Sequence, residues 1–170
     1  MKESLKPVVK AIQARCNVTV QEFRDEVALT LQPECLVDLC RVLRDDFSFE
    51  MLENETAVDY WPQQEPRFHM VYHLSSMKRA AVLCLRVPLN GNAPVIPTLE
   101  KVYPNANWME REVWDMFGIW FEGHGDMRRI LMPADWKGHP QRKDYPLGYE
   151  EVQFTFNFDQ ISVKKPAPKE

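Results

Sequence analysis

Two stretches near the N-terminus place apolar residues at helical spacing. Residues 1–16 carry apolar side chains three or four positions apart, with lysines on the opposite side. This pattern predicts an N-terminal helix. After Pro33, which suits the first turn of a helix, apolar groups recur at the same spacing and predict a second helix that ends near Asp45 or Asp46.

A third helix is expected from Asn107 onward, over residues 107–117. The Asn107 side chain suits the N-cap position, and Glu110 stands three residues later, as in a capping box. Gly118 is expected to end this helix in the left-handed conformation. Just upstream, Thr98 is expected to cap a further short helix.

Strands are predicted where β-branched and aromatic residues gather between turn-like segments. The separators are short, so we expect antiparallel neighbours in a meander. The predicted strands cover residues 27–31, 49–52, 57–61, 68–75, 80–89 and 119–121.

These elements predict an α+β fold. We expect a mixed, largely antiparallel sheet with helices mainly on one face, plus a C-terminal extended arm. The expected parts are an N-terminal helical arm at 1–18, an α+β domain at 19–124, and an extended C-terminal strap and tail at 125–170.

Composition narrows the class of protein. The 170 residues are 45% hydrophobic, which is enough for one domain with a real core. No apolar run approaches the roughly 20 residues needed to span a bilayer, and the N-terminus lacks a secretory signal. The formal net charge of −4 disfavours nucleic acid as a partner. The four cysteines show no CxxC spacing, so we expect reduced thiols.

The strap is rich in proline and glycine, and it has a local excess of positive charge between Arg128 and Pro146. Proline stiffens an extended chain, which therefore loses less entropy when it docks. Trp136 and Tyr145 suit anchors of a protein–protein contact, and arginines suit the carboxylates of a partner. On the preceding helix, Arg111 and Asp115 are four apart and are expected to pair.

Other kinds of chemistry compete with this interface hypothesis. His124, Asp126, His139 and Asp144 are residue types that bind metals, but no short ligand motif is present. His69 and His73 share a strand face without a third ligand. Glu112 and Glu110 are two apart on a helix and do not face each other, which disfavours an acid–base pair. Basic residues interleaved with Trp136 are a weaker hypothesis for nucleic-acid binding.

The same region resembles a known family. One signature element is matched by Glu110, Arg111, Glu112, Asp115, Met116, Phe117, His124, Arg128, Ile130 and Leu131. A second, GHPQRKDYPL, covers residues 138–147. Together these resemble the 30 kDa subunit family of respiratory complex I, the proton-pumping NADH:quinone oxidoreductase. Gly125 and Gln141 depart from the family pattern.

The resemblance implies a non-catalytic structural or assembly subunit in the hydrophilic arm of that complex. It implies docking on the large quinone-site subunit and its iron–sulfur neighbour, with FMN, iron–sulfur clusters and quinone carried by other subunits. The complex would hold the chain at the cytoplasmic side of a bacterial cell membrane. The alternatives are a ferredoxin-dependent or hydrogenase-type relative, or, in a different class, a stand-alone metal-dependent enzyme using the histidines and aspartates named above.

No catalytic, cofactor-binding or metal-binding residue is expected in this chain. The residues expected at the partner interface or in the strap are Glu110, Arg111, Glu112, Asp115, His124, Arg128, Arg129, Trp136, His139, Arg142, Lys143, Asp144 and Tyr145. An alternative is that the motif is internally structural, with Glu110 and Glu112 pairing these arginines inside the chain.

Overall fold

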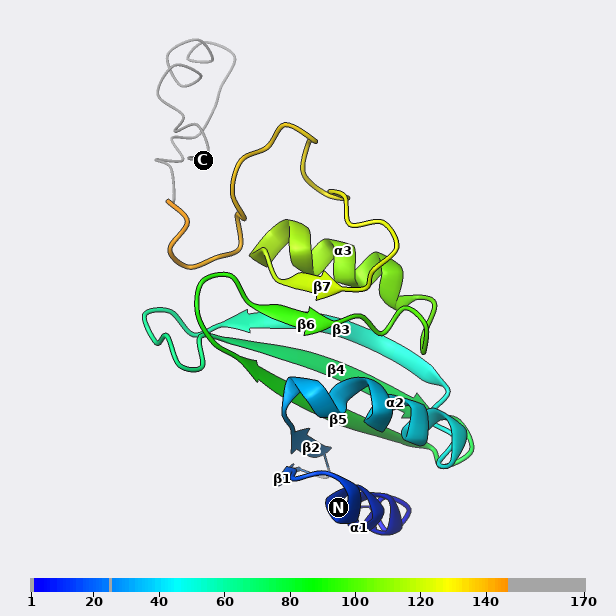
Figure 1. Cartoon of the computed structure of the whole chain (residues 1–170). Helices are drawn as coiled ribbons and strands as arrows, with labels where there is room; N and C mark the ends of the chain where they lie inside the picture. The colour runs from blue at the N-terminus through cyan, green and yellow to red at the C-terminus, as the bar shows by residue number, and fades with distance from the viewer. Residues whose placement is uncertain (1, 25, 147–170) are drawn as a thin grey trace, which may run out of the picture.

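The computed structural model describes residues 2–24 and 26–146 (Figure 1). Within that part, the helices are α1 (Lys6–Arg15), α2 (Leu36–Asp45) and α3 (Ala106–Phe117), with a short 3₁₀ helix at Pro33–Cys35. The strands are β1 (Thr19–Phe23), β2 (Glu26–Thr30), β3 (Met51–Asp59), β4 (Phe68–Ser76), β5 (Ala81–Leu89), β6 (Val95–Pro97) and β7 (Trp120–Glu122).

The main sheet has the strand order β1-β2-β5-β4-β3. Strands β3, β4 and β5 form the expected antiparallel meander, and β1 pairs antiparallel with β2. The pairing of β2 with β5 is parallel, so the sheet is mixed. The predicted α+β fold with a largely antiparallel sheet is confirmed.

One face of the main sheet forms the core. Alternate residues of β5, such as Leu83, Leu85 and Val87, are fully buried, as expected for a strand with one covered face. Side chains of all three helices join the same core, for example Ile12 of α1 and Leu39 of α2. Helix α3 packs against β3, at the far edge of the sheet from β1 (Figure 1).

Two predicted strands, 49–52 and 57–61, are one strand in the structure. Strand β3 runs unbroken from Met51 to Asp59, with a bulge between Leu52 and Asn54. The strand was not recognised as continuous because the run Glu-Asn-Glu in its middle, residues 53–55, consists of poor strand formers. Strand β1 was not predicted, since its residues are mostly exposed and lack apolar alternation.

A second small sheet was only partly predicted: its strand β7 matches the strand expected at 119–121, but β6 was missed. Strands β6 and β7 pair in parallel, with Val95 opposite Trp120. The expected short helix at Thr98 is wrong, because residues 98–103 form a single turn that Pro104 prevents from continuing. The Thr98 hydroxyl instead accepts a hydrogen bond from the Glu100 N–H.

The predicted capping box of α3 is also wrong. The helix begins at Ala106, after Asn105, so Asn107 lies inside it and donates to Glu100 instead of capping. The C-terminal prediction is confirmed: Gly118 adopts the left-handed conformation with φ of 72°.

No helix within the described residues is long and apolar enough to cross a membrane. Residues 1–18, 19–124 and 125–170 remain a predicted division of the chain, and the tail at 147–170 lies outside the described residues.

Candidate functional site: the strap and its anchors

The described part of the strap, residues 125–146, contains no helix or strand. It runs as an irregular chain past α3 and ends close to the main sheet (Figure 1). Backbone ladders do not hold it, so side chains of α3 and the sheet must satisfy its polar groups. Two groups of contacts, here called anchors, do this: one around Asp115 of α3 and one around Arg67 at the start of β4.

The first anchor is the Asp115 carboxylate of α3, which is fully buried. Its Oδ2 atom accepts the backbone N–H groups of Ile130, Leu131 and Met132 at 3.1, 2.9 and 2.9 Å. Its Oδ1 atom pairs with the Arg129 guanidinium. Burial alone would raise the pKa of Asp115, but these donors together lower it. The anchor therefore holds a charged carboxylate inside the protein.

The expected pair of Arg111 with Asp115 is wrong. The Arg111 guanidinium instead donates to the carbonyls of Arg128 and Arg129 at 3.1 and 3.3 Å, and it stacks on the Trp108 ring. Three strap amides and Arg129 already surround Asp115, so its charge is satisfied without Arg111. Both α3 side chains thus bind the same segment of the strap.

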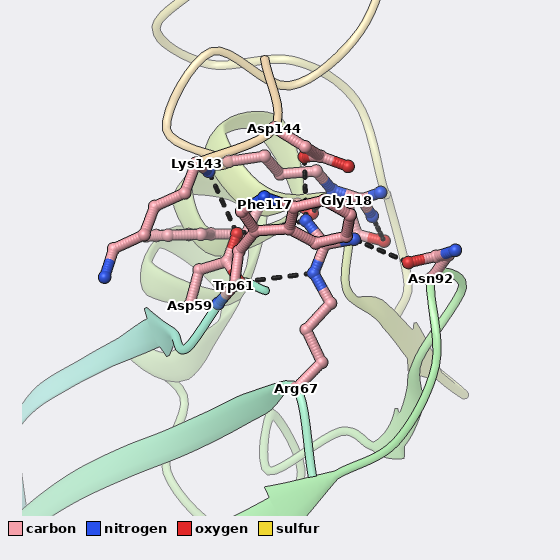
Figure 2. Close-up of polar contacts among 9 residues, drawn as sticks. Asp59, Trp61, Arg67, Asn92, Phe117, Gly118, Lys143 and Asp144 are labelled. Carbon is pink, nitrogen blue, oxygen red and sulfur yellow. Dashed lines mark hydrogen bonds and ion pairs between the residues drawn. The ribbon is translucent and has the colours of Figure 1, made fainter. Parts of the chain in front are cut away.

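The second anchor is Arg67, whose side chain is fully buried where β4 begins (Figure 2). Its guanidinium pairs with Asp59 at 3.1 Å and with Asp144 of the strap at 2.7 Å, and it also donates to Asn92. Its guanidinium carbon lies over the rings of Trp61 and Phe68, 4.8 Å from the centroid of each. These contacts compensate for the burial of the charge.

The neighbouring strap residues bind around Arg67. The Lys143 N–H donates to Asp59 at 2.9 Å, and Arg142 donates to the carbonyls of Phe117 and Gly118 at the end of α3 (Figure 2). Burial alone would raise the pKa of Asp59, but its bonds to Arg67 and to backbone amides lower it. This anchor joins β3, β4, α3 and the strap.

Gly118 is required at the point where the strap crosses the end of α3. Its φ of 72° favours glycine, and an added Cβ would collide with the His139 ring and the Arg142 guanidinium. His139 also hydrogen-bonds the Asp115 carbonyl at 3.1 Å. The left-handed cap therefore has a second role, which is to admit the strap.

Arg67 and Asp59 were missed by sequence reasoning. Asp59 stands in a predicted strand and Arg67 in a predicted turn, and neither belongs to a recognisable motif. Their partners, Lys143 and Asp144, are 84 and 77 positions away. A lone arginine beside aromatic residues was the available signal, and by itself it is weak.

The remaining predicted strap residues are less involved. Glu112 is exposed on α3, and Arg128 forms an exposed ion pair with Asp126. Trp136 and Tyr145 are partly buried against the chain itself. Among the described residues, no ion pair joins an arginine to Glu110 or Glu112, so the glutamate–arginine pairs of the internal alternative are not seen there.

The four residues of the hypothetical metal site do not converge. His124 bonds the Asn107 carbonyl, His139 the Asp115 carbonyl, and Asp144 pairs with Arg67. Across residues 2–24 and 26–146, no group of three or more metal-ligating side chains comes together. His69 and His73 do share one face of β4, but no third ligand joins them in that part of the chain.

Comparison with known proteins agrees with the resemblance seen in the motifs. Residues 29–151 match the family described as the respiratory-chain NADH dehydrogenase, 30 Kd subunit. An NADH-quinone oxidoreductase subunit of Roseiflexus sp. (strain RS-1) is 51% identical over 151 residues, 88% of this chain and 86% of that protein. The equivalent NADH-quinone oxidoreductase subunit of Geobacter sulfurreducens is 44% identical over 149 residues, 86% of this chain and 92% of that protein.

Two solved structures share the fold. A trypsin-resistant fragment of Nqo5 aligns with a TM-score of 0.64 and 28% identity over 72% of this chain and 98% of the fragment. A chain of the membrane-bound sulfane sulfur reductase, an archaeal respiratory membrane complex, aligns with a TM-score of 0.76. At 20% identity over 99% of this chain and 97% of its own length, that chain shows the fold alone. By family match and identity, this chain belongs to the 30 kDa subunit family of respiratory complex I, the NADH:quinone oxidoreductase.

Proposed function

We propose that this chain is a structural subunit without a catalytic group of its own. In this proposal it sits in the hydrophilic arm of the complex and docks on the large quinone-site subunit and its iron–sulfur neighbour. FMN, iron–sulfur clusters and quinone belong to other subunits, and the complex holds this chain at the cytoplasmic side of a bacterial membrane.

The docking proposal rests on which groups the charged side chains of the strap and of α3 contact. Arg129 and Arg142, expected at the partner interface or in the strap, bond groups of their own chain. The Asp115 carboxylate is likewise hydrogen-bonded within the fold, to backbone amides of the strap. A partner would therefore be recognised by other groups, and the strap's role is to fix the surface that presents them.

Exposed apolar side chains on α3, the strap and the small sheet are the best candidates for that surface. Trp108 of α3 is 61% exposed and Leu131 of the strap is 59% exposed. Val95 and Trp120 face each other across the small sheet and are 52% and 48% exposed. Large apolar groups exposed to this degree on neighbouring elements are typical of protein–protein contacts. We assign the docking surface to these four residues.

The first experiment is gentle solubilisation of membranes from cells that carry this chain with an affinity tag at native expression. We expect iron–sulfur and quinone-site subunits to co-purify in fixed ratio, because the docked chain is part of the complex. The flavin-bearing NADH module should come with them, and its absence would favour a ferredoxin-dependent or hydrogenase-type assembly. A tagged chain found alone in the soluble fraction would contradict the proposal.

Substitutions then separate docking from folding. We expect Trp108→Ala and Trp120→Ala to reduce co-purification several-fold while circular dichroism of the isolated chain is unchanged. Phe23→Ala is the matched control, because Phe23 is 68% exposed on β1, far from the proposed surface. Arg142→Glu should instead unfold the isolated chain, since Arg142 binds the end of α3. Loss of assembly by Arg142→Glu with an intact fold would restore the interface role of the strap.

A further inference from the structure

A second group of buried carboxylates lies between the main sheet and α3, away from the strap. Glu55 of β3 and Tyr72 of β4 are direct cross-strand neighbours on the core face. The residues are 5% and 0% exposed. Both carboxyl oxygens of Glu55 and the Tyr72 hydroxyl are buried without a hydrogen-bond partner among the described residues. Buried polar atoms of this kind normally have a hydrogen-bond partner. Because these atoms have none, the question is whether the Glu55 carboxyl group is charged or protonated.

The groups that face Glu55 come from every element packed around it. Tyr72 lies on β4, Cys40 on α2 and Glu110 on α3. Burial and the charge of Glu55 raise the pKa of Tyr72 and of Cys40, and burial and the charge of Glu110 raise the pKa of Glu55. Within residues 2–24 and 26–146, the charged side chain that acts on Glu55 is another carboxylate, Glu110. No lysine or arginine of that part of the chain compensates for it.

Glu110 differs from Glu55 because donors surround it. It accepts the Thr98 hydroxyl at 2.5 Å and the Leu99 N–H at 2.6 Å. Beyond it, the Glu100 carboxylate accepts the N–H of Gly125 and the side chain of Asn107. Of the two buried glutamates, Glu110 is therefore better able to carry a negative charge.

Nearby His124 directs both ring nitrogens to backbone groups. Its Nδ1 atom accepts the Asp126 N–H at 3.0 Å, so its proton lies on Nε2 and points to the Asn107 carbonyl at 3.1 Å. The Nε2 atom is 3.9 Å from Glu110.

Two carboxylates buried together without a cation cannot both remain charged. We propose that Glu55 is an uncharged carboxylic acid at neutral pH, and that Glu55, Tyr72 and Glu110 form a buried site that binds one proton between the sheet and α3. A neutral Glu55 has an O–H donor that the carboxylate lacks, and its cross-strand neighbour Tyr72 carries a hydroxyl that can donate or accept.

The expected titration agrees with this geometry. Burial, followed by the nearby Glu110 charge, raises the pKa of Glu55 well above its ordinary value. Burial also raises the pKa of Glu110 to about 7, although its two donors oppose the rise. A raised pKa means that the folded protein holds a proton that the unfolded chain releases. The resulting stability is complete below the unfolded pKa of about 4.3 and is lost as the pH rises through the folded pKa.

This site would couple the proton to the position of α3. When Glu55 loses its proton, two negative charges face each other across the contact of β3 with α3. Helix α3 also carries Asp115, to which the strap is anchored. Alkaline pH should therefore loosen α3 and the strap together.

The first test is urea unfolding of the full chain across pH, comparing the wild type, Glu55→Gln and Glu112→Gln. Between about pH 5 and about pH 8, the wild-type folding equilibrium constant should fall by up to tenfold per pH unit for each retained proton. Glu55→Gln should flatten this fall. Glu112→Gln, exposed on the same helix as Glu110, should leave it unchanged. An identical pH dependence for Glu55→Gln and the wild type would overturn the proposal.

The second test needs no variant to fold. Infrared spectra of the wild-type chain at about pH 7 should show the stretching band of a neutral, buried carboxyl group. Carbon-13 labelling of glutamate assigns the band by its isotope shift. We expect this band from a glutamate, and Glu55→Gln should remove it if the variant folds. Fully ionised glutamates at that pH would overturn the proposal.

Discussion

Asp115 and Glu55 are both buried carboxyl groups at α3, one on the strap side of the helix and one on the sheet side. Asp115 accepts three backbone amides and pairs with Arg129, and its pKa is lowered. Glu55 has no hydrogen-bond partner among the described residues, and its pKa is raised. Burial is common to both, so it does not decide their charge.

The difference lies in the donors that each carboxyl group meets. An irregular strap leaves its backbone amides unpaired, and three of them converge on Asp115. A regular strand directs its amides within the plane of the sheet, so the side chain of Glu55 on the core face of β3 meets none of them. Irregular chain can therefore stabilise a buried anion, whereas the face of a sheet favours the neutral acid.

The largest expected effect comes from removing the Asp115 carboxylate, which is the charged one of these two carboxyl groups. Asp115→Ala leaves Arg129 without its partner and three strap amides without an acceptor. We expect a loss of about 3–5 kcal/mol in the free energy of unfolding, measured with urea on the full chain. Glu112→Ala on the exposed face of α3 is the control and should change it by about 0.5 kcal/mol or less. A similar small change for Asp115→Ala would mean that the strap does not depend on this anchor.

An intermediate effect is expected when the cation alone is removed. Arg129→Met leaves Asp115 with its three backbone donors, so the carboxylate keeps part of its stabilisation. We expect a loss of about 1.5–3 kcal/mol in urea unfolding, together with a higher pKa of Asp115. Arg128→Met is the matched control, because its ion pair is mostly exposed and contributes about 0–1 kcal/mol. Equal losses in the two variants would argue against a special role for Arg129.

The smallest expected effect is on the loss of folding stability at acidic pH. The pKa values of Asp59, Asp115 and Asp144 are all lowered, so their stabilisation is present above the unfolded pKa of about 3.9 and is lost as the pH falls through the folded values. Asp115→Asn should make the acid-side loss shallower, as measured by thermal unfolding at successive pH values. An unchanged acid side would show that Asp115 titrates alike in the folded and unfolded chains.

Periodicity predicted most of the fold but not its irregular contacts. The spacing of apolar residues located α1, α2 and the meander, because each buries one continuous face. The position of Gly118 after an apolar stripe located the end of α3. Its start was misjudged because Asn105 and Asn107 suit an N-cap equally well by residue type. The acidic centre of β3 hid a strand, because Glu55 is buried where a strand normally places an apolar residue.

The site was only half predictable for a related reason. Motif resemblance and local charge selected Asp115, Arg129 and Arg142, but they left open whether these residues contact a partner or brace the strap, and in the structure all three bond groups of their own chain. Whether an arginine faces outward or inward depends on carbonyls and carboxylates that the fold brings together from distant positions. Arg67 shows this most clearly, since its two aspartates precede and follow it by 8 and 77 positions.

The Arg67 anchor also constrains the order in which the molecule can be built. Asp144 lies 77 positions after Arg67, so a ribosome must synthesise β4, β5, β6, α3 and β7 before the anchor can close. Until then, a guanidinium meant for the interior has only Asp59 and Asn92 as polar partners. Contacts between such distant positions form slowly, because the intervening chain must first be ordered. We therefore expect residues 125–146 of the strap to pack late in folding, and a nascent chain that ends before them would expose this charge to chaperones and proteases.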